Sequence, residues 1–142
     1  MTGLVIATAS VYVVLAVCHA YWAAGCTWPA HDEEALARAV VGGTGIRMPS
    51  PFACLVITGL LAIAGGFVLA TRGFGPIAAS SELRVLVVGI ASVMLLRGLG
   101  GLFENRLRPA IRGTRYARYN RVFYSPFALA VGIATLACGV WA

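Results

Sequence analysis

The chain has 142 residues, of which 60% are hydrophobic and only 11% are charged, and its formal net charge is +6. A soluble domain of this length could not bury so much apolar surface, so the composition excludes that class and leaves room for a single domain. All eleven basic residues are arginine, which excludes chemistry that needs a lysine amine, such as Schiff-base formation.

Four apolar stretches predict the fold class. A helix needs about 20 apolar residues to cross the hydrocarbon core of a bilayer, and stretches of this length cover residues 4–25, 52–70, 83–103 and 122–141. We therefore expect an all-α, four-transmembrane-helix bundle that forms one integral membrane domain over 1–142. The first stretch is expected to remain a spanning helix, because it is too long for a secretory signal and no positive segment precedes it.

A short helix is predicted in the connection between the first two spanning helices, over residues 33–41. It is preceded by Asp32 and opens with two glutamates, and acidic residues at this position cap a helix and complement its dipole. Leu36 and Val40 would lie on one face of it. This pattern is typical of a helix that rests at a membrane interface.

The second and fourth spanning helices share the sequence Ser-Pro-Phe-Ala, at residues 50–53 and 125–128. A serine N-cap followed by proline in the first helical position is typical of a helix start. A weaker match is the sequence Ala-Ser-Val, which occurs in the first helix at residues 9–11 and in the third helix at residues 91–93. We therefore expect two helical hairpins that repeat in parallel about a pseudo-twofold axis along the membrane normal.

The arginines predict the orientation. Eight of them lie in the first and third connections, at Arg38, Arg47, Arg106, Arg108, Arg112, Arg115, Arg118 and Arg121. Only Arg72 and Arg84 border the second connection. Basic residues near helix ends accumulate on the cytoplasmic side, so we expect both termini on the non-cytoplasmic side. Because topology accounts for these arginines, no nucleic-acid partner is expected.

Two ionisable residues are expected inside the spans, His19 and Arg97. Each lies six residues before the cytoplasmic end of its predicted helix, which corresponds to a depth of about 9 Å. Ionisable residues inside a span are candidates for function. Glu104 follows Arg97 by seven residues and lies on the same helical face. These positions predict one polar cavity that opens toward the cytoplasm, with Glu104 at its mouth.

We assign roles to the residues around this cavity. His19 and Glu104 are the candidate catalytic acid and base, and the candidate substrate-binding residues are Trp22, Arg97, Asn105 and Tyr124. Structural roles are the alternative: Arg97 would snorkel to the interface, His19 would be satisfied by one hydrogen bond, and Trp22 would belong to an aromatic belt. No metal site and no cofactor are expected, because no carboxylate shares a span with a histidine.

Five short motifs follow one another along the chain. They are His-Ala-Tyr-Trp-Ala-Ala-Gly at 19–25, Met-Pro-Ser-Pro at 48–51, Leu-Arg-Gly at 96–98, Thr-Arg-Tyr-Ala-Arg-Tyr-Asn at 114–120 and Tyr-Ser-Pro at 124–126. In this order they resemble the bacterial four-helix membrane family called domain of unknown function 3995. The resemblance implies a multi-pass protein of the bacterial cytoplasmic (plasma) membrane and supplies no active site. Cys26 departs from it, since a second glycine is expected there.

Three functions remain open. The first is an acid/base enzyme or a binder that acts on an amphipathic lipid or isoprenoid-type molecule from the inner leaflet, with Arg97 holding its polar head. The second is an accessory or assembly subunit of a larger complex with a membrane protein partner. The third is a small transporter or channel built as a homo-oligomer. Co-purification distinguishes these functions. A lipid-like molecule that stays bound supports the enzyme or binder, and a stable protein partner supports the accessory subunit.

Overall fold

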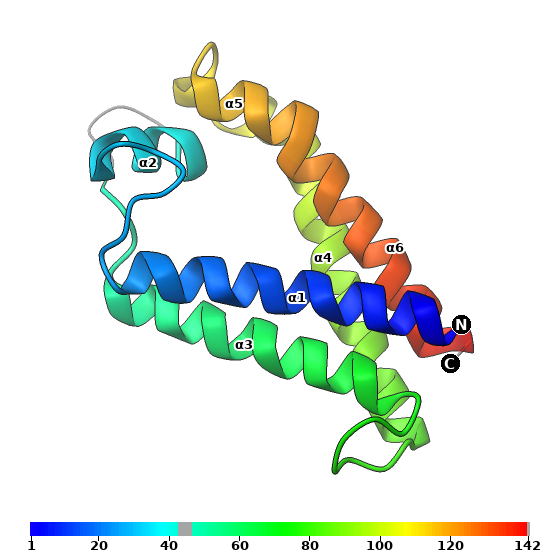
Figure 1. Cartoon of the computed structure of the whole chain (residues 1–142). Helices are drawn as coiled ribbons and strands as arrows, with labels where there is room; N and C mark the ends of the chain where they lie inside the picture. Colours follow the sequence, from blue (N-terminus) through cyan, green and yellow to red (C-terminus); the bar gives the residue numbers. More distant parts are fainter. Residues whose placement is uncertain (43–46, 142) are drawn as a thin grey trace.

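The structure is a computed structural model that describes residues 1–42 and 47–141 (Figure 1). Its helices are α1 (Thr2–Ala23), α2 (Glu33–Val40), α3 (Pro51–Ala70), α4 (Ser81–Leu107), a 3-10 turn (Pro109–Ile111), α5 (Arg115–Tyr119), a π turn (Asn120–Tyr124) and α6 (Ser125–Trp141). These residues contain no strand. Four helical runs are long and apolar enough to cross a membrane: Thr2–Ala23, Pro51–Ala70, Ser81–Leu107 and Arg115–Trp141. The predicted all-α class with four such helices is confirmed.

Side-chain caps begin four of the helices. The side-chain oxygens of Asp32, Ser50, Ser80 and Thr114 each accept the backbone N–H three residues later, at 2.7, 3.2, 3.2 and 3.2 Å respectively. Such a cap satisfies a backbone donor that the helix itself leaves without a partner. The cap at Ser80 places the start of α4 two residues before the predicted one, and α4 also extends past the predicted end at residue 103 to Leu107.

The last spanning run begins earlier than the sequence predicts. We expected a start at residue 122 with Ser125 as an N-cap, but one continuous helical run extends from Arg115. Ser125 has a helical φ of −70° and ψ of −48°, so it is not a cap. Pro126 has no N–H, and in a regular α-helix its ring would clash with the carbonyl of Val122. The wider π turn directly before Pro126 accommodates the ring.

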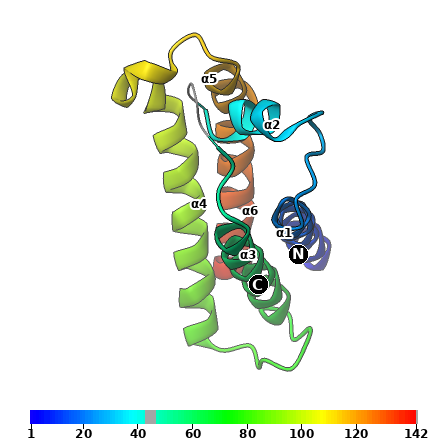
Figure 2. The same ribbon diagram turned by 90° about the vertical axis from the view of Figure 1, so that its left-hand side faces the viewer.

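The four long helices pack as two hairpins, α1 with α3 and α4 with α6 (Figures 1 and 2). The hairpins meet near the chain termini, where the Tyr12 hydroxyl and Thr135 Oγ1 share a buried hydrogen bond of 2.9 Å. Cys138 Sγ lies 3.9 Å from Thr8 Oγ1 in the same region. Away from the termini the two hairpins diverge, and α2 and α5 contact each other at the wider end.

Glycines allow α4 and α6 to approach each other closely. A Cβ atom at Gly98 would lie 2.9 Å from the backbone nitrogen of Leu129, and one at Gly132 would lie 3.0 Å from that of Leu95. Small residues at such contacts are the usual means of packing helices in lipid. Gly100 differs, because a Cβ there would meet nothing within 4 Å.

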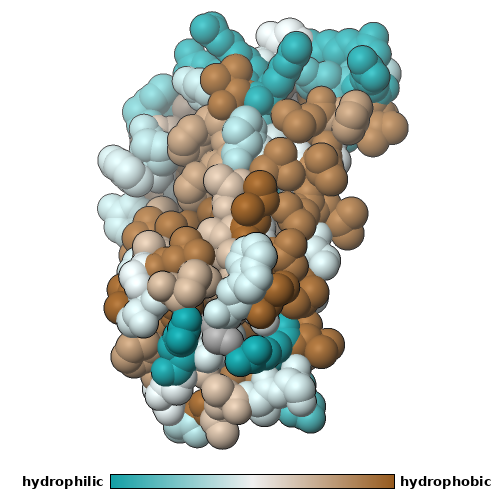
Figure 3. Space-filling view, turned by 90° about the vertical axis from the view of Figure 1, so that its right-hand side faces the viewer, coloured by the Kyte–Doolittle hydropathy of each residue, from teal (hydrophilic) through white to brown (hydrophobic). Residues whose placement is uncertain are grey.

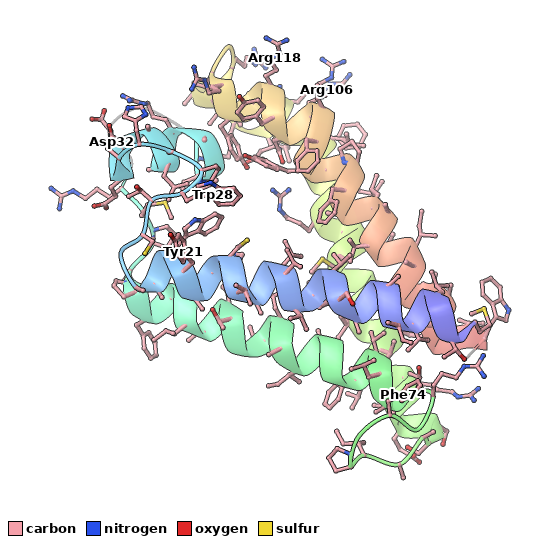
Figure 4. The ribbon with its side chains drawn as sticks, viewed as in Figure 1. Tyr21, Trp28, Asp32, Phe74, Arg106 and Arg118 are labelled. Carbon is pink, nitrogen blue, oxygen red and sulfur yellow. The ribbon has the colours of Figure 1, made fainter. Side chains whose placement is uncertain are left out.

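Polar and apolar side chains occupy different parts of the surface. Hydrophilic side chains gather at the end of the molecule that carries α5, and an apolar belt follows directly beside them (Figure 3). Arg106 and Arg118 lie at this end, whereas Phe74 lies in the connection at the opposite end (Figure 4). Exposed apolar residues, among them Phe52, Val85 and Leu96, cover the long helices. This surface matches the hydrocarbon of a bilayer.

Candidate functional site

A hydrogen-bonded polar cluster joins α4 to the π turn and α6. Its centre is Asn120, which is only 1% exposed. The amide nitrogen of Asn120 donates to the Gly101 carbonyl oxygen at 3.0 Å and to Glu104 Oε2 at 2.7 Å. Its Oδ1 accepts from Arg97 Nη2 at 3.1 Å and from Ser125 Oγ at 3.2 Å. Both ends of the amide are therefore fully used, and the side chain has one fixed orientation.

Glu104 has both carboxylate oxygens engaged. Besides the amide of Asn120, Oε2 accepts the Tyr116 hydroxyl at 2.8 Å, and Oε1 accepts Arg108 Nη1 at 2.7 Å. The Glu104 side chain is 16% exposed. Its negative charge is thus paired with Arg108 at the end of α4. We use "polar cluster" below for Arg97, Gly101, Glu104, Tyr116, Asn120 and Ser125.

Arg97 is positioned but not neutralised. Asn120 is the acceptor that holds its guanidinium, and no carboxylate of the described residues forms an ion pair with it. An amide dipole orients a positive charge without cancelling it. A guanidinium also has more N–H donors than this one contact uses. Donors of Arg97 are therefore left for an acceptor that the described residues do not supply.

The polar cluster depends on the absence of a side chain at Gly101. A Cβ atom there would overlap Ser125 Oγ and would lie 2.5 Å from Arg97 Nη1. The Gly101 carbonyl also accepts the Asn120 amide. Gly101 therefore gives the space in which the Arg97 and Ser125 side chains both reach Asn120.

An open cavity of about 330 Å³ lies beside the polar cluster. Arg97, Glu104 and Tyr116 supply its polar wall, and Leu96 and Gly100 lie on its apolar side. Leu96 is also strongly exposed on the surface of α4. A polar wall next to an exposed apolar one suits an amphipathic molecule, whose head and tail need different surroundings.

Tyr124 lies next to the polar cluster and connects it to α2. Its ring centroid is 6.4 Å from that of Tyr116, but its hydroxyl donates to the Ala39 carbonyl in α2 at 3.2 Å. Gly42, just after α2, lies against the Tyr116 ring so closely that a Cβ would overlap it. The two tyrosines therefore attach α2 to the second hairpin.

His19 and Trp22 lie on the first hairpin. His19 Nδ1 donates to the Leu15 carbonyl one turn earlier at 2.8 Å, and its ring centroid is 5.0 Å from that of Trp22. Trp22 Nε1 donates to the Trp28 carbonyl at 2.9 Å and borders a separate cavity of about 290 Å³. Within the described part of the chain, no hydrogen bond, ion pair or ring contact joins either residue to Arg97.

The observed helix ends place His19 and Arg97 at different distances from the ends of their helices. α1 ends at Ala23 and α4 at Leu107, so His19 lies about 6 Å and Arg97 about 15 Å from the end of its helix. The two are therefore not equally far from their helix ends, as the sequence-based bounds implied. Asn105 also lies apart: its carbonyl accepts Arg112 Nε at 2.8 Å, and the residue borders a third cavity.

From the sequence we expected Arg97 and Glu104 at the site and Ser125 at the same end of the spans, but not the hydrogen bonds that connect them. Asn120, Tyr116 and Ser125 carry the hydrogen bonds of the polar cluster. The sequence feature that could have indicated this is an asparagine and a serine at the start of an apolar helix. A polar side chain that becomes buried there needs a hydrogen-bond partner. In a regular α-helix, positions five apart point in different directions. Only the π turn brings Asn120 and Ser125 together.

The four long apolar helices indicate a multi-pass membrane protein with a polar cluster in its second hairpin. The family model described as "Protein of unknown function (DUF3995)" matches residues 12–135. The chain belongs to this family, and the match covers the whole polar cluster as well as His19 and Trp22. No curated protein and no solved structure matches the chain.

Proposed function

We propose that this protein binds the anionic head of an amphipathic lipid or isoprenoid-type molecule at Arg97, within the inner leaflet. The supporting observation is the Arg97 guanidinium, which Asn120 orients and no described carboxylate neutralises, beside an open cavity. Arg97 is exposed on an apolar helix, and in the hydrocarbon of a bilayer its spare donors would have no water to bind, which favours an anionic partner. The exposed apolar face at Leu96 gives the tail of the ligand a place next to the bilayer.

The hydrogen bonds of Glu104 favour binding over acid–base catalysis. A catalytic base needs a lone pair that can reach the substrate proton. Here three donors, from Arg108, Asn120 and Tyr116, already occupy the two oxygens. We therefore assign Glu104 to positioning: it fixes Asn120, which in turn fixes Arg97.

We place the protein in the bacterial cytoplasmic membrane with both termini on the non-cytoplasmic side. The arginine asymmetry supports this orientation, because eight arginines lie in the connections that carry α2 and α5. Both termini and the α3–α4 connection lie at the other end of the molecule (Figure 1). We also propose that the hairpins α1–α3 and α4–α6 are parallel repeats. In support, each pairs its own two helices.

The test compares Arg97→Leu with Arg106→Leu. Each substitution removes one arginine from the same half of α4, but Arg106 lies outside the polar cluster, near the Phe103 ring. Each variant is extracted in mild detergent, and the retained lipids are identified by native mass spectrometry. We expect Arg97→Leu to lose at least about tenfold of the retained anionic lipid, the equivalent of one charge-assisted hydrogen bond, and Arg106→Leu to keep it.

Thermal unfolding of both variants checks that they are folded. An equal loss of lipid in the two variants would contradict the proposal, because Arg97 would then act only as one more interfacial charge. Retention of a protein partner in place of a lipid would favour the role of a subunit in a larger complex.

A further inference from the structure

The part of the chain after Glu104 has a strong local excess of positive charge. It contains six arginines and no acidic residue up to the C-terminus at Ala142. Glu104 itself pairs with Arg108, at the end of α4. Arg112 is used within the connection, where Nε donates to the Asn105 carbonyl. The remaining arginines of α5 and the π turn have no acidic partner among the residues described.

Three of these arginines border one cavity. Arg115, Arg118 and Arg121 follow each other at intervals of three residues and line a cavity of about 820 Å³ together with Asn105 and Val122. We call it the arginine cavity. This cavity is separate from the one at Arg97, because the two have no lining residue in common. The cavity at Arg97 is lined by Leu96, Arg97, Gly100, Gly101, Glu104 and Tyr116. Like charges at this spacing repel one another, so an anion in the cavity would relieve a cost that is already present.

The arginine cavity lies where the hydrophilic end of the protein meets its apolar belt. Arg118 lies at the hydrophilic end of the molecule (Figure 4), and on the face drawn in Figure 3 an apolar belt follows this end. Val122, which lines the cavity, is 71% exposed, and Leu107 at the end of α4 is 76% exposed. In a bilayer whose hydrocarbon covers the apolar belt, this would be the level at which phospholipid headgroups meet their acyl chains.

We propose that the arginine cavity binds an anion that carries two phosphate groups. Planar guanidinium groups match phosphate oxygens with paired hydrogen bonds. Three arginines without an acidic partner are enough to neutralise the two negative charges of two phosphodiesters, and the cavity volume is within the range of small-molecule sites. The position beside the apolar belt favours a lipid headgroup as the source. Free diphosphate shares the same chemistry, and the experiment separates the two.

The test compares two double variants. Arg118→Gln with Arg121→Gln removes two arginines from the cavity. Arg72→Gln with Arg84→Gln removes two that border the α3–α4 connection, and this connection lies at the opposite end of the molecule. Each protein in detergent is titrated with cardiolipin, with phosphatidylcholine and with sodium pyrophosphate, and binding is followed by native mass spectrometry. Each basic residue near an anionic headgroup adds a factor of about five in affinity, so we expect the cavity variant to bind cardiolipin about 30-fold more weakly.

The control variant should bind cardiolipin like the unchanged protein. If pyrophosphate displaces cardiolipin at similar concentration, the cavity recognises phosphate from either source; if it does not, the lipid is the ligand. Equal binding of cardiolipin and phosphatidylcholine, or an equal loss in both double variants, would overturn the proposal. Arg97→Leu keeps the arginine cavity intact, so adding Arg118→Gln and Arg121→Gln to it should still weaken cardiolipin binding about 30-fold, although any lipid held at Arg97 is already lost; this separates the proposal from the one at Arg97.

Discussion

At the residue scale, two neighbouring glycines in α4 have different environments. Gly101 faces Ser125, Arg97 and Asn120 in the polar cluster, whereas a Cβ at Gly100 would have open space around it. Both lie in the same turn of α4 and therefore have the same helical backbone conformation. They form a matched pair in which only the contact with the polar cluster differs.

We predict that Gly101→Ala destabilises the protein and Gly100→Ala does not. The new Cβ at position 101 would push Ser125 Oγ and the Arg97 guanidinium off Asn120, and such overpacking costs about 1–3 kcal/mol. At position 100 alanine should be neutral or should stabilise by up to about 1 kcal/mol, because it is a better helix former than glycine. Thermal unfolding in detergent measures both, and equal midpoints would contradict the geometry of the polar cluster.

Sequence reasoning found the charged residues of the site but not the amide between them. Arg97 and Glu104 were visible because ionisable side chains are rare in apolar spans and the seven-residue spacing puts both on one face. The role of Asn120 depends on a change of helical register before Pro126. That change follows from packing around a proline, and it leaves no periodic pattern in the sequence.

At the element scale, α2 joins the two hairpins at the wider end. The Tyr124 hydroxyl bonds the Ala39 carbonyl, and Gly42 lies against the Tyr116 ring. Gly42 has a φ of +81° and Gly25 has a φ of +84°. Any other residue is strained at both positions, but only at Gly42 would a Cβ meet another side chain.

We predict that Gly42→Ala releases α2 from the second hairpin, while Gly25→Ala only adds the backbone strain of about 1–2 kcal/mol. The measurement is limited digestion with trypsin, which cleaves after arginine and therefore reports on Arg38 within α2. Gly42→Ala should speed cleavage at Arg38, because local opening of a helix exposes its backbone. Cleavage at the same rate in both variants would show that the Tyr116 contact does not hold α2.

The helix α2 itself was predictable, in contrast to its partner. Asp32 caps it, and Glu33 and Glu34 lie in its first turn. These signals are local, so they can be recognised in the sequence without knowledge of the fold. The structure ends it at Val40, one residue before the predicted end. Its contact with α5 was not predictable, because it depends on how far the two hairpins diverge.

At the scale of the whole molecule, the number of spans followed from the sequence, whereas the faces by which the helices meet did not. In α1, Val5 and Ala9 are buried while Val13 and Val14 are exposed. A residue that meets lipid and one that meets another helix have the same apolar character. Apolar length therefore predicts the number of spans, and it says nothing about which faces meet.

We predict that both termini face away from the cytoplasm. In a background without the native cysteines, Thr2→Cys should react with a membrane-impermeant thiol reagent in intact cells, because it begins α1 at the end with few arginines. Arg118→Cys, at the opposite end (Figure 4), should react only after the cells are permeabilised. The reverse pattern would invert the orientation and place Arg97 in the outer leaflet.

The divergence of the two hairpins gives the molecule unequal breadth across the bilayer. It is narrow where Tyr12 and Thr135 join the hairpins and broad where α2 and α5 lie. A body of this form displaces more area from one leaflet than from the other. Its fit to a membrane then depends on curvature as well as on thickness. In a bilayer, a body of this form would impose an asymmetric load that four parallel helices would not impose.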